Sequence, residues 1–297
     1  MSFVKRLRAI LSRRFYAIGY GSIEEIDICE DGIPRNVNWI KFKNYKINWI
    51  ADPYLLSENE TSIDFLVEEW IEKDNKGRLV KFTYDKKSKK TFNKRIILEL
   101  TTHLSFPSII KEEGNIYICP ENAASDQQKI YKYNIEKELL EEPVIIIDEA
   151  LLDVNIVKIN SSFYAFGIKL LKNDKGDNNH LLIYKSDNLL GHYTFYQEIT
   201  NPLAQERGAG SFFIHDKKLI RPVQNCEGDY GRNVIFKEVT FVDGVFKEKV
   251  IGGLYPTKCF PDGLHTFNIL NDKYVIDGMA YNVGNWMTYL KRMLNKW

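Results

Sequence analysis

Short apolar strands alternate with polar turns along most of the chain, and the alternation repeats about every fifty residues. Each repeat opens with a polar or glycine-containing turn that leads into an apolar strand. A hairpin and a second β-branched or aromatic strand follow, as in Ile63–Trp70 and Lys273–Asp277. We mark each opening by one residue, the residue three positions before the first core apolar residue of that repeat. The five marker residues are Asp52, Phe106, Asp153, Ala209 and Leu264. The intervals between these markers are 54, 47, 56 and 55 residues.

A period of this length in a strand-rich sequence is typical of a β-propeller, in which each repeat forms one four-stranded blade. The sequence therefore predicts an all-β, five-bladed β-propeller over residues 36–283. The start of each blade's innermost strand faces the central funnel of such a fold. The five marker positions are consequently where we expect a ligand to lie.

Both ends of the chain show helical rather than strand periodicity. Five apolar side chains lie on one face of the segment Ser2–Phe15, and five basic side chains occupy the rest. This predicts a basic, amphipathic N-terminal segment (residues 1–35) that binds an anionic membrane surface; the alternative is a helix packed on the propeller. A second amphipathic helix is predicted over residues 284–297, with these apolar positions: Trp286, Leu290, Met293 and Trp297.

The composition narrows the class of protein. The chain has 297 residues with 41 basic and 40 acidic side chains, a balance that disfavours a nucleic-acid binder. Four scattered cysteines are typical of buried thiols in a reducing compartment. No signal peptide and no run of roughly 18 apolar residues is present. We therefore expect a cytoplasmic protein, either free or peripheral on the inner membrane face. No metal or cofactor motif occurs, so no cofactor is expected.

Carboxylates at corresponding positions suggest glycosyl chemistry. Asp52 and Asp153 mark the openings of blades one and three, and glycosyl hydrolysis or transfer uses a pair of carboxyl groups. Both could instead be turn residues that accept hydrogen bonds from backbone amides. Of the adjacent Glu68 and Glu69, only one can face the funnel, and Glu69 shares the side of Val67. The predicted catalytic residues are Asp52, Asp153 and Glu69.

Arginines near the fourth opening suggest an anionic ligand. A guanidinium binds phosphate at two points, and Arg207, Arg221 and His265 could converge on one phosphate-bearing sugar. The alternative is that Arg207 pairs with Asp153 or Asp52 and holds the blades together. The predicted substrate-binding residues are Glu121, Arg207, Arg221, Gln224, Tyr230, His265 and His103.

An ordered set of nine segments carries a family resemblance. The segments are Ala51–Pro53, Val67–Glu69, His103–Pro107, Pro120–Glu121, Leu152–Asp153, Arg207–Gly210, Arg221–Gln224, Tyr230–Gly231 and His265–Asn268. Over residues 36–283 the chain resembles the N-terminal domain family of plant glucosamine inositolphosphorylceramide transferases and its bacterial relatives from polysaccharide loci. It is more distantly similar to the five-bladed propellers of the arabinanase, invertase and levansucrase clan. The resemblance implies a sugar-handling propeller in glycan or glycolipid assembly.

The distant clan also implies roles for individual residues. An aspartate of its first blade, here Asp52, is the base or nucleophile, and one of its third blade, here Asp153, orients substrate and tunes acidity. A glutamate opening the fourth blade is the acid, but the register here places Arg207 nearer the funnel than Glu206. This departure disfavours a glycoside hydrolase. We favour glycosyl transfer from a nucleotide-sugar or lipid-linked phosphosugar, and a glycan-binding module that positions substrate for a partner enzyme remains the main alternative.

Overall fold

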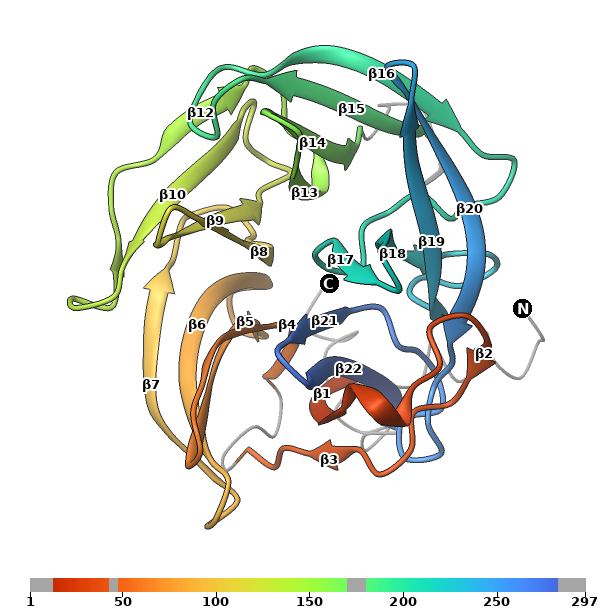
Figure 1. Cartoon of the computed structure of the whole chain (residues 1–297). Coiled ribbons are helices and arrows are strands. Elements are labelled where there is room, and N and C mark those ends of the chain that lie inside the picture. The colour runs from red at the N-terminus through yellow and green to blue at the C-terminus, as the bar shows by residue number, and fades with distance from the viewer. Residues whose placement is uncertain (1–12, 43–47, 170–179, 283–297) are drawn as a thin grey trace, which may run out of the picture.

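Five antiparallel sheets stand around a central axis, as Figure 1 shows. This computed structural model describes residues 13–42, 48–169 and 180–282. The innermost strands β4, β8, β13, β17 and β21 lie nearest the centre, and the other strands of each sheet extend outward. The predicted all-β, five-bladed propeller is therefore confirmed. Among the described residues the only helical element is the short 3-10 turn η1 (Ile23–Glu25).

The first four blades follow the chain in order. Blade one comprises β4 (Trp49–Glu58), β5 (Ser62–Ile71), β6 (Lys76–Asp85) and β7 (Lys90–Leu98). Blade two comprises β8 (Ser105–Glu112), β9 (Asn115–Glu121), β10 (Gln128–Asn134), β11 (Leu139–Leu140) and β12 (Val144–Ile147). Blade three comprises β13 (Leu152–Ile159), β14 (Ser162–Ile168), β15 (His180–Ser186) and β16 (Thr194–Thr200). Blade four comprises β17 (Phe213–His215), β18 (Lys218–Asn225), β19 (Asn233–Val242) and β20 (Val245–Leu254), with β2 (Asp31–Gly32) beside β20.

Blade five joins the two ends of the chain. Its inner strands β21 (Phe267–Leu270) and β22 (Lys273–Asn282) come from the C-terminal part, and β1 (Arg13–Ser22) and β3 (Asn38–Trp39) come from the N-terminal part. Strands β1 and β22 pair over ten residues, from Arg13 opposite Asn282 to Ser22 opposite Lys273. This pairing joins the two ends of the chain within blade five and so closes the ring.

The ring closure corrects the predicted N-terminal boundary. The propeller begins at Arg13 rather than at residue 36, because β1, β2 and β3 belong to blades five and four. The predicted helix Ser2–Phe15 is wrong at its end, since Arg13–Phe15 are strand residues paired with β22. The remainder of that helix, and the C-terminal helix predicted over residues 284–297, lie outside the described residues.

The hydrophobic core is divided among the contacts between neighbouring blades. Tyr54 of blade one packs edge-on against Phe106 of blade two, with ring centroids 5.6 Å apart. Phe236 of blade four packs against Phe267 of blade five at 4.9 Å. Burial of each such side chain contributes about 1.5–3 kcal/mol. Because both faces of each sheet are covered, the blades hold the funnel-facing side chains in a rigid frame.

A β-bulge recurs at the marker position of the first three blades. The strand register shifts between Ala51 and Tyr54 in β4, and corresponding shifts occur in β8 and β13. Asp52, Phe106 and Asp153 there have φ angles of 49°, 43° and 46°. This left-handed conformation is uncommon for residues other than glycine. The recurring bulge turns these residues out of the regular sheet alternation at the centre of the ring.

Candidate active site in the central funnel

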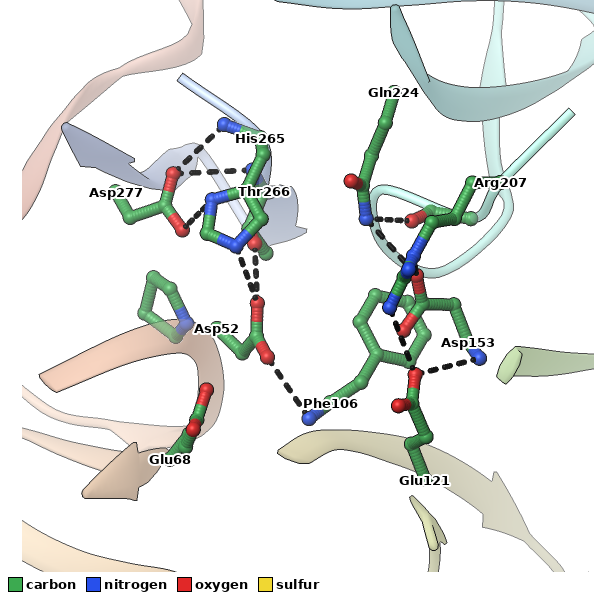
Figure 2. A network of polar contacts seen from close by, with 12 residues as sticks. Asp52, Glu68, Phe106, Glu121, Asp153, Arg207, Gln224, His265, Thr266 and Asp277 are labelled. Atoms are coloured by element: carbon green, nitrogen blue, oxygen red, sulfur yellow. Dashed lines mark hydrogen bonds and ion pairs between the residues drawn. The ribbon is translucent and has the colours of Figure 1, made fainter. Parts of the chain in front are cut away.

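Asp52 and Asp153 reach one polar network at the centre of the ring, as their shared slot predicts. Figure 2 shows Asp52 with Glu68, His265 and Asp277 on one side of the network, and Asp153 with Glu121, Arg207 and Gln224 on the other. Asp52 is 4% exposed and Asp153 is 2% exposed. The bulges in β4 and β13 therefore place two carboxyl groups from different blades in the same buried region.

Asp52 accepts contacts from both neighbouring blades. Its Oδ2 accepts the backbone N–H of Phe106 at 2.9 Å, and its Oδ1 accepts the Thr266 hydroxyl at 2.8 Å. Oδ1 also lies 3.3 Å from Nε2 of His265, whose Nδ1 lies 2.6 Å from Oδ2 of Asp277. Burial acts to lower the pKa of His265, but the carboxylates of Asp277 and Asp52 raise it above its usual value. His265 is therefore a cationic bridge between two carboxylates.

Asp277 fixes this arrangement and was not predicted. Its Oδ1 accepts the backbone N–H groups of His265 and Thr266 at 2.9 and 3.1 Å, which orients the imidazole. The sequence does carry a signal for it, because an aspartate follows the apolar pair Val275-Ile276 inside β22. A charged side chain at the fully buried end of an apolar run requires a partner.

Glu68 is the residue that the structure brings to Asp52 in place of the predicted Glu69. Burial raises the pKa of the Glu68 carboxyl well above its usual value, and the charge of Asp52 and a hydrogen bond to it raise it further. The buried Oε1 of Glu68 finds no hydrogen-bond donor among the described residues. Burial also raises the pKa of Asp52, but contacts with His265, Thr266 and Phe106 oppose this, so of the two neighbouring carboxyl groups Glu68 is the one that favours the protonated form.

The placement of Glu69 in the funnel is wrong. Its Oε2 accepts hydrogen bonds from Arg78, with Arg78 Nη2 at 2.7 Å, and its Oε1 pairs with Lys94. Successive residues of a strand point to opposite faces, so Glu69 turns away from the group that holds Glu68. The repeat itself could have distinguished the two glutamates. Glu68 lies opposite Ala51, the residue before the marker Asp52. In the same way Glu121 of blade two lies opposite Ser105, the residue before the marker Phe106.

Arg207 joins Glu121 of blade two to Asp153 of blade three. Its Nη2 lies 3.1 Å from Oε2 of Glu121, and its Nε donates to Oδ2 of Asp153. The same Glu121 oxygen accepts the backbone N–H of Asp153 at 3.2 Å, and Gln224 Nε2 donates to Asp153 Oδ2 at 2.9 Å. Burial acts to raise the pKa of Glu121, but Arg207 holds it below its usual value. Burial raises the pKa of Asp153 well above its usual value in spite of Arg207.

Arg221 is not in the funnel, contrary to its predicted anion-binding role. It lies inside blade four, 1% exposed, between the carboxylates of Glu206 and Glu248. Its Nη2 lies 2.6 Å from Glu206 Oε2 and 2.9 Å from Glu248 Oε2, and Lys237 completes the cluster with both glutamates. All the charges of this cluster are matched within the protein. Glu206 thus lies in the blade-four cluster, whereas Arg207 contacts Asp153 and Glu121 in the funnel network, as the sequence register predicts.

His103 and Tyr230 lie at the less buried border of the network. Nδ1 of His103 accepts the backbone N–H of Gly77 at 2.7 Å, so Nε2 carries the ring proton, 3.9 Å from Oε1 of Glu68. Burial lowers the pKa of His103, which favours this neutral form. The guanidinium carbon of Arg207 lies 5.1 Å from the centroid of the Tyr230 ring, which also packs edge-on against His265 at 5.5 Å. Both residues contact the network from its border.

Asp52, His265 and Asp277 form a three-residue group whose ligand atoms lie within 4.8 Å of one another, a spacing that a metal ion could use. Their mutual ion pairs, the Thr266 hydroxyl and three backbone N–H groups already occupy these atoms. The sequence carries no metal-binding motif and leaves open whether funnel carboxylates hold a divalent ion, and a metal at this group would have to replace some of these contacts.

The electrostatics suit acid–base chemistry on a neutral or cationic sugar. Five carboxyl groups (Asp52, Glu68, Glu121, Asp153 and Asp277) surround two cationic side chains, Arg207 and His265. A protonated Glu68 beside an ionised Asp52 provides a proton donor and a proton acceptor at one place. Such an excess of acid groups stabilises positive charge, including that of an oxocarbenium-like transition state.

We expect the replacement of Arg207 by methionine to make stability strongly dependent on pH. Without the guanidinium, the folded-state pKa of Glu121 rises above its unfolded-state value and that of Asp153, which is already raised, rises further, so the variant loses stability as the pH increases. The stability difference from the wild type should be small near pH 4 and reach about 1–3 kcal/mol near neutral pH, since two buried carboxyl groups lose their partner. Urea unfolding at several pH values measures this difference. A difference that is constant with pH would show that Arg207 contributes by packing alone.

The family is established by comparison of the sequence with known families. A family model described as "Glucosamine inositolphosphorylceramide transferase 1, N-terminal" matches residues 37–257. This match covers most of the chain, including Arg207 and the three residues around it, Glu121, Asp153 and Gln224. The chain belongs to this family. The resemblance expected from the nine segments is thereby confirmed.

Curated members of the family are much longer than this chain. The glucosamine inositolphosphorylceramide transferase 1 of Oryza sativa subsp. japonica is 26% identical over 257 residues, which cover 83% of this chain and 33% of the relative. That of Arabidopsis thaliana is 27% identical over 152 residues, which cover 47% of this chain and 19% of the relative. The chain thus spans about a third of the length of the rice relative that it matches.

Solved structures of the same fold come from glycoside hydrolase family GH43. A GH43 β-1,3-galactosidase with galactodeoxynojirimycin has a TM-score of 0.53 at 9% identity, over 79% of this chain and 90% of that protein. A GH43 β-xylosidase/α-arabinofuranosidase from a compost microbial metagenome, in complex with xylotriose, has a TM-score of 0.52 at 12% identity. The match covers 82% of this chain and 96% of that protein. At these identities the likeness shows the propeller fold. Within the described ranges there is no helix of the length and hydrophobicity that a membrane crossing requires.

Proposed function

We propose that the central funnel binds a sugar and transfers its glycosyl unit in glycan or glycolipid assembly. The observation that carries this proposal is the buried Glu68 carboxyl beside Asp52, whose Oε1 has no hydrogen-bond partner among the described residues and whose pKa is raised well above its usual value by burial and by the charge of Asp52. A group in this state is suited to protonate a departing oxygen. The family's name, which refers to glycolipid glycosylation, supports the same class of reaction.

The proposed step uses the Glu68–Asp52 pair as one proton relay. As the bond between the anomeric carbon and the leaving-group oxygen breaks, Glu68 gives its proton to that oxygen. A hydroxyl oxygen of the acceptor forms the new bond to the anomeric carbon, and its proton passes to Asp52. Transfer of this proton from Asp52 back to Glu68 restores the pair. Arg207, together with Glu121 and Asp153, then orients the sugar from the other side of the network.

The nature of the donor is part of the proposal. The names of the relatives refer to glucosamine, and an excess of carboxyl groups favours the ammonium group of an amino sugar. A phosphate-bearing donor, predicted from the arginines, would have Arg207 as its contact, since Arg221 is enclosed by glutamates. The side chain of Arg207 is 15% exposed, and its Nη1 donates to no described residue.

A non-catalytic glycan-binding module is the second candidate, and a specific observation favours it. The carboxylates of Asp52 and Glu121 each accept a backbone N–H from the next blade, at 2.9 and 3.2 Å. These bonds join the blades together, and Asp52 accepts a backbone amide as the alternative interpretation of the marker aspartates requires, whereas Asp153 donates its own N–H to Glu121. In this case the funnel holds a sugar for a partner enzyme and Glu68 contributes a hydrogen bond only.

Binding of a sugar in the funnel should raise the melting temperature of the protein. A ligand at a hundred times its dissociation constant stabilises the folded state by about 2.7 kcal/mol. We expect glucosamine and its nucleotide-sugar to have this effect, and Asp52→Asn to retain it while losing turnover. Thermal unfolding with each compound, together with mass spectrometry of the products, makes the measurement.

The two candidate functions give different results in this experiment. A binding module is stabilised by sugar, yields no product with any donor, and has weaker binding in the Asp52→Asn variant. Stabilisation by nucleoside diphosphate but not by sugar would contradict both candidates. We also propose that the protein acts on the cytoplasmic face of a membrane, which cell fractionation of the full chain tests.

A further inference from the structure

An apolar pocket lies between blades five and one, beside the funnel network. It has a volume of about 460 Å³, which is within the range of small-molecule sites. Strands β1, β3 and β4 and the segment after β20 form its walls. Six aromatic side chains line it: Phe15, Tyr16, Trp39, Phe42, Trp49 and Phe260. A pocket with such walls favours a hydrocarbon ligand.

One of these aromatic side chains connects the pocket to the funnel. The Tyr16 ring packs against the Trp49 ring at 4.8 Å, and against the His265 ring at 5.0 Å. Tyr16 and Trp49 line the pocket, while His265 holds Asp52. A molecule in the pocket therefore lies one side chain away from the acid–base pair.

Positive charge continues from the pocket along the outer edge of blade one. Lys41 and Phe42 line both this pocket and a second one, of about 560 Å³, in which Lys89, Lys90 and the 53% exposed Phe92 lie. Lys41, Lys89 and Lys90 are exposed and form no ion pair with a described carboxylate. Exposed lysines beside aromatic side chains complement a ligand with an apolar chain and an anionic head.

We propose that this pocket binds the hydrocarbon chain of a lipid whose anionic head group lies against Lys41, Lys89 and Lys90. The occupant is one lipid molecule, with its chain among the six aromatic side chains. The inference goes beyond the proposed function, because it requires binding and no glycosyl transfer. If both hold, the lipid is the anchor of the substrate, and its position brings the sugar end to the funnel.

The two exposed cysteines allow a direct test with an internal control. Cys259 lines the pocket, whereas Cys29 lines a different one, formed by the segment around η1 and β2 together with His215, Asp216 and Leu254. We expect palmitoyl lysophosphatidic acid, below its critical micelle concentration, to slow alkylation of Cys259 by N-ethylmaleimide and to leave Cys29 unaffected. Peptide mass spectrometry measures both rates. Inorganic phosphate alone should protect neither cysteine.

The head group and the chain can be separated with matched ligands and variants. Monopalmitoyl glycerol, which has the same chain without charge, should require a higher concentration, by about fivefold for each lysine that contacts the head group. The combined change Lys41→Ser, Lys89→Ser and Lys90→Ser should remove this difference. These lysines are exposed, so the fold should be retained, and the rate of Cys29 alkylation checks it.

Three results would overturn the proposal. The first is that no lipid slows alkylation of Cys259, and the second is that charged and neutral lipids protect it equally. The third is that Cys259 resists alkylation without lipid and becomes reactive when residues 284–297 are deleted. That result would mean that the C-terminal residues, rather than a lipid, occupy the pocket in the intact protein. None of these results depends on glycosyl transfer, so failure of the lipid site is distinguishable from failure of the proposed function.

Discussion

Replacing Glu68 by glutamine should lower the rate of glycosyl transfer by about 10²–10⁴-fold, the usual contribution of a general acid. Burial and Asp52 keep the Glu68 carboxyl protonated, so glutamine preserves both its shape and its neutral charge. The amide can still donate a hydrogen bond to Asp52, and the protein should remain folded with unchanged sugar binding. Initial rates with saturating donor, together with a melting curve, measure the two effects separately.

The adjacent Glu69 is the matched control for this experiment. Glu69→Gln changes the same chemical group one residue away, on the opposite face of β5, where it pairs with Arg78 and Lys94. Its rate of transfer should be close to that of the wild type. The wild-type rate should fall as the pH increases through the raised pKa of Glu68, because the proton to be donated is then lost. Equal rates in the two glutamine variants would show that Glu68 is not the acid.

Replacing Arg221 by methionine should destabilise the fold by roughly 3–5 kcal/mol, the cost of breaking a buried ion pair. The change leaves Glu206 and Glu248 with Lys237 as their remaining cation in the cluster. Burial acts to raise the pKa of Glu248, but Arg221 and Lys237 hold it at about 2. Loss of Arg221 raises this folded-state pKa, so the variant should be least stable at neutral and alkaline pH. Urea unfolding measures the loss.

Lys218 on the same strand provides the comparison. It pairs with Glu238 at 3.0 Å on the exposed side of blade four, so Lys218→Met should leave stability nearly unchanged. Sugar binding should be the same in both variants, because neither residue is in the funnel network. Loss of sugar binding in a folded Arg221→Met protein would restore its predicted role as an anion contact.

The repeat predicts the fold because each blade is a local unit with its own turns and strands. Closure of the ring could not be found in this way. Strand β1 pairs with β22, and the pairing of Arg13 with Asn282 joins positions at opposite ends of the chain. A segment with several basic residues and spaced apolar ones also fits a helix, and only the tertiary partner decides between the two structures. The N-terminal boundary was therefore misplaced.

The site residues divide in the same way between local pattern and distant partner. Asp52 and Asp153 were found because their slot repeats, and the left-handed bulges give that slot a structural meaning. Alternation shows that Glu68 and Glu69 face opposite sides but leaves open which side is the funnel. The partners of Arg221 are Glu206, fifteen residues before it, and Glu248, twenty-seven after it. No spacing rule connects positions that far apart, so its enclosure could be learned only from the structure.

The sequence predicts the burial of the cysteines less well than it predicts the funnel positions. The sequence predicts buried thiols, and Cys119 is buried, but Cys29 and Cys259 are exposed. Both lie in segments between strands, where the pattern of apolar residues does not predict whether a side chain is buried. All four thiols are free, in agreement with their scattered spacing.

The central claim is that the funnel performs glycosyl transfer with Glu68 as its acid, and one measurement tests it most directly. The wild type, Glu68→Gln and Glu69→Gln proteins are incubated with a panel of nucleotide-linked and lipid-linked sugars, and the products are identified by mass spectrometry. We predict a transferred sugar with the wild type and Glu69→Gln, and at least a hundredfold less with Glu68→Gln, as expected for loss of a general acid that contributes about 10²–10⁴-fold. Sugar binding by all three proteins without a product from any donor would contradict the claim and identify the funnel as a binding site.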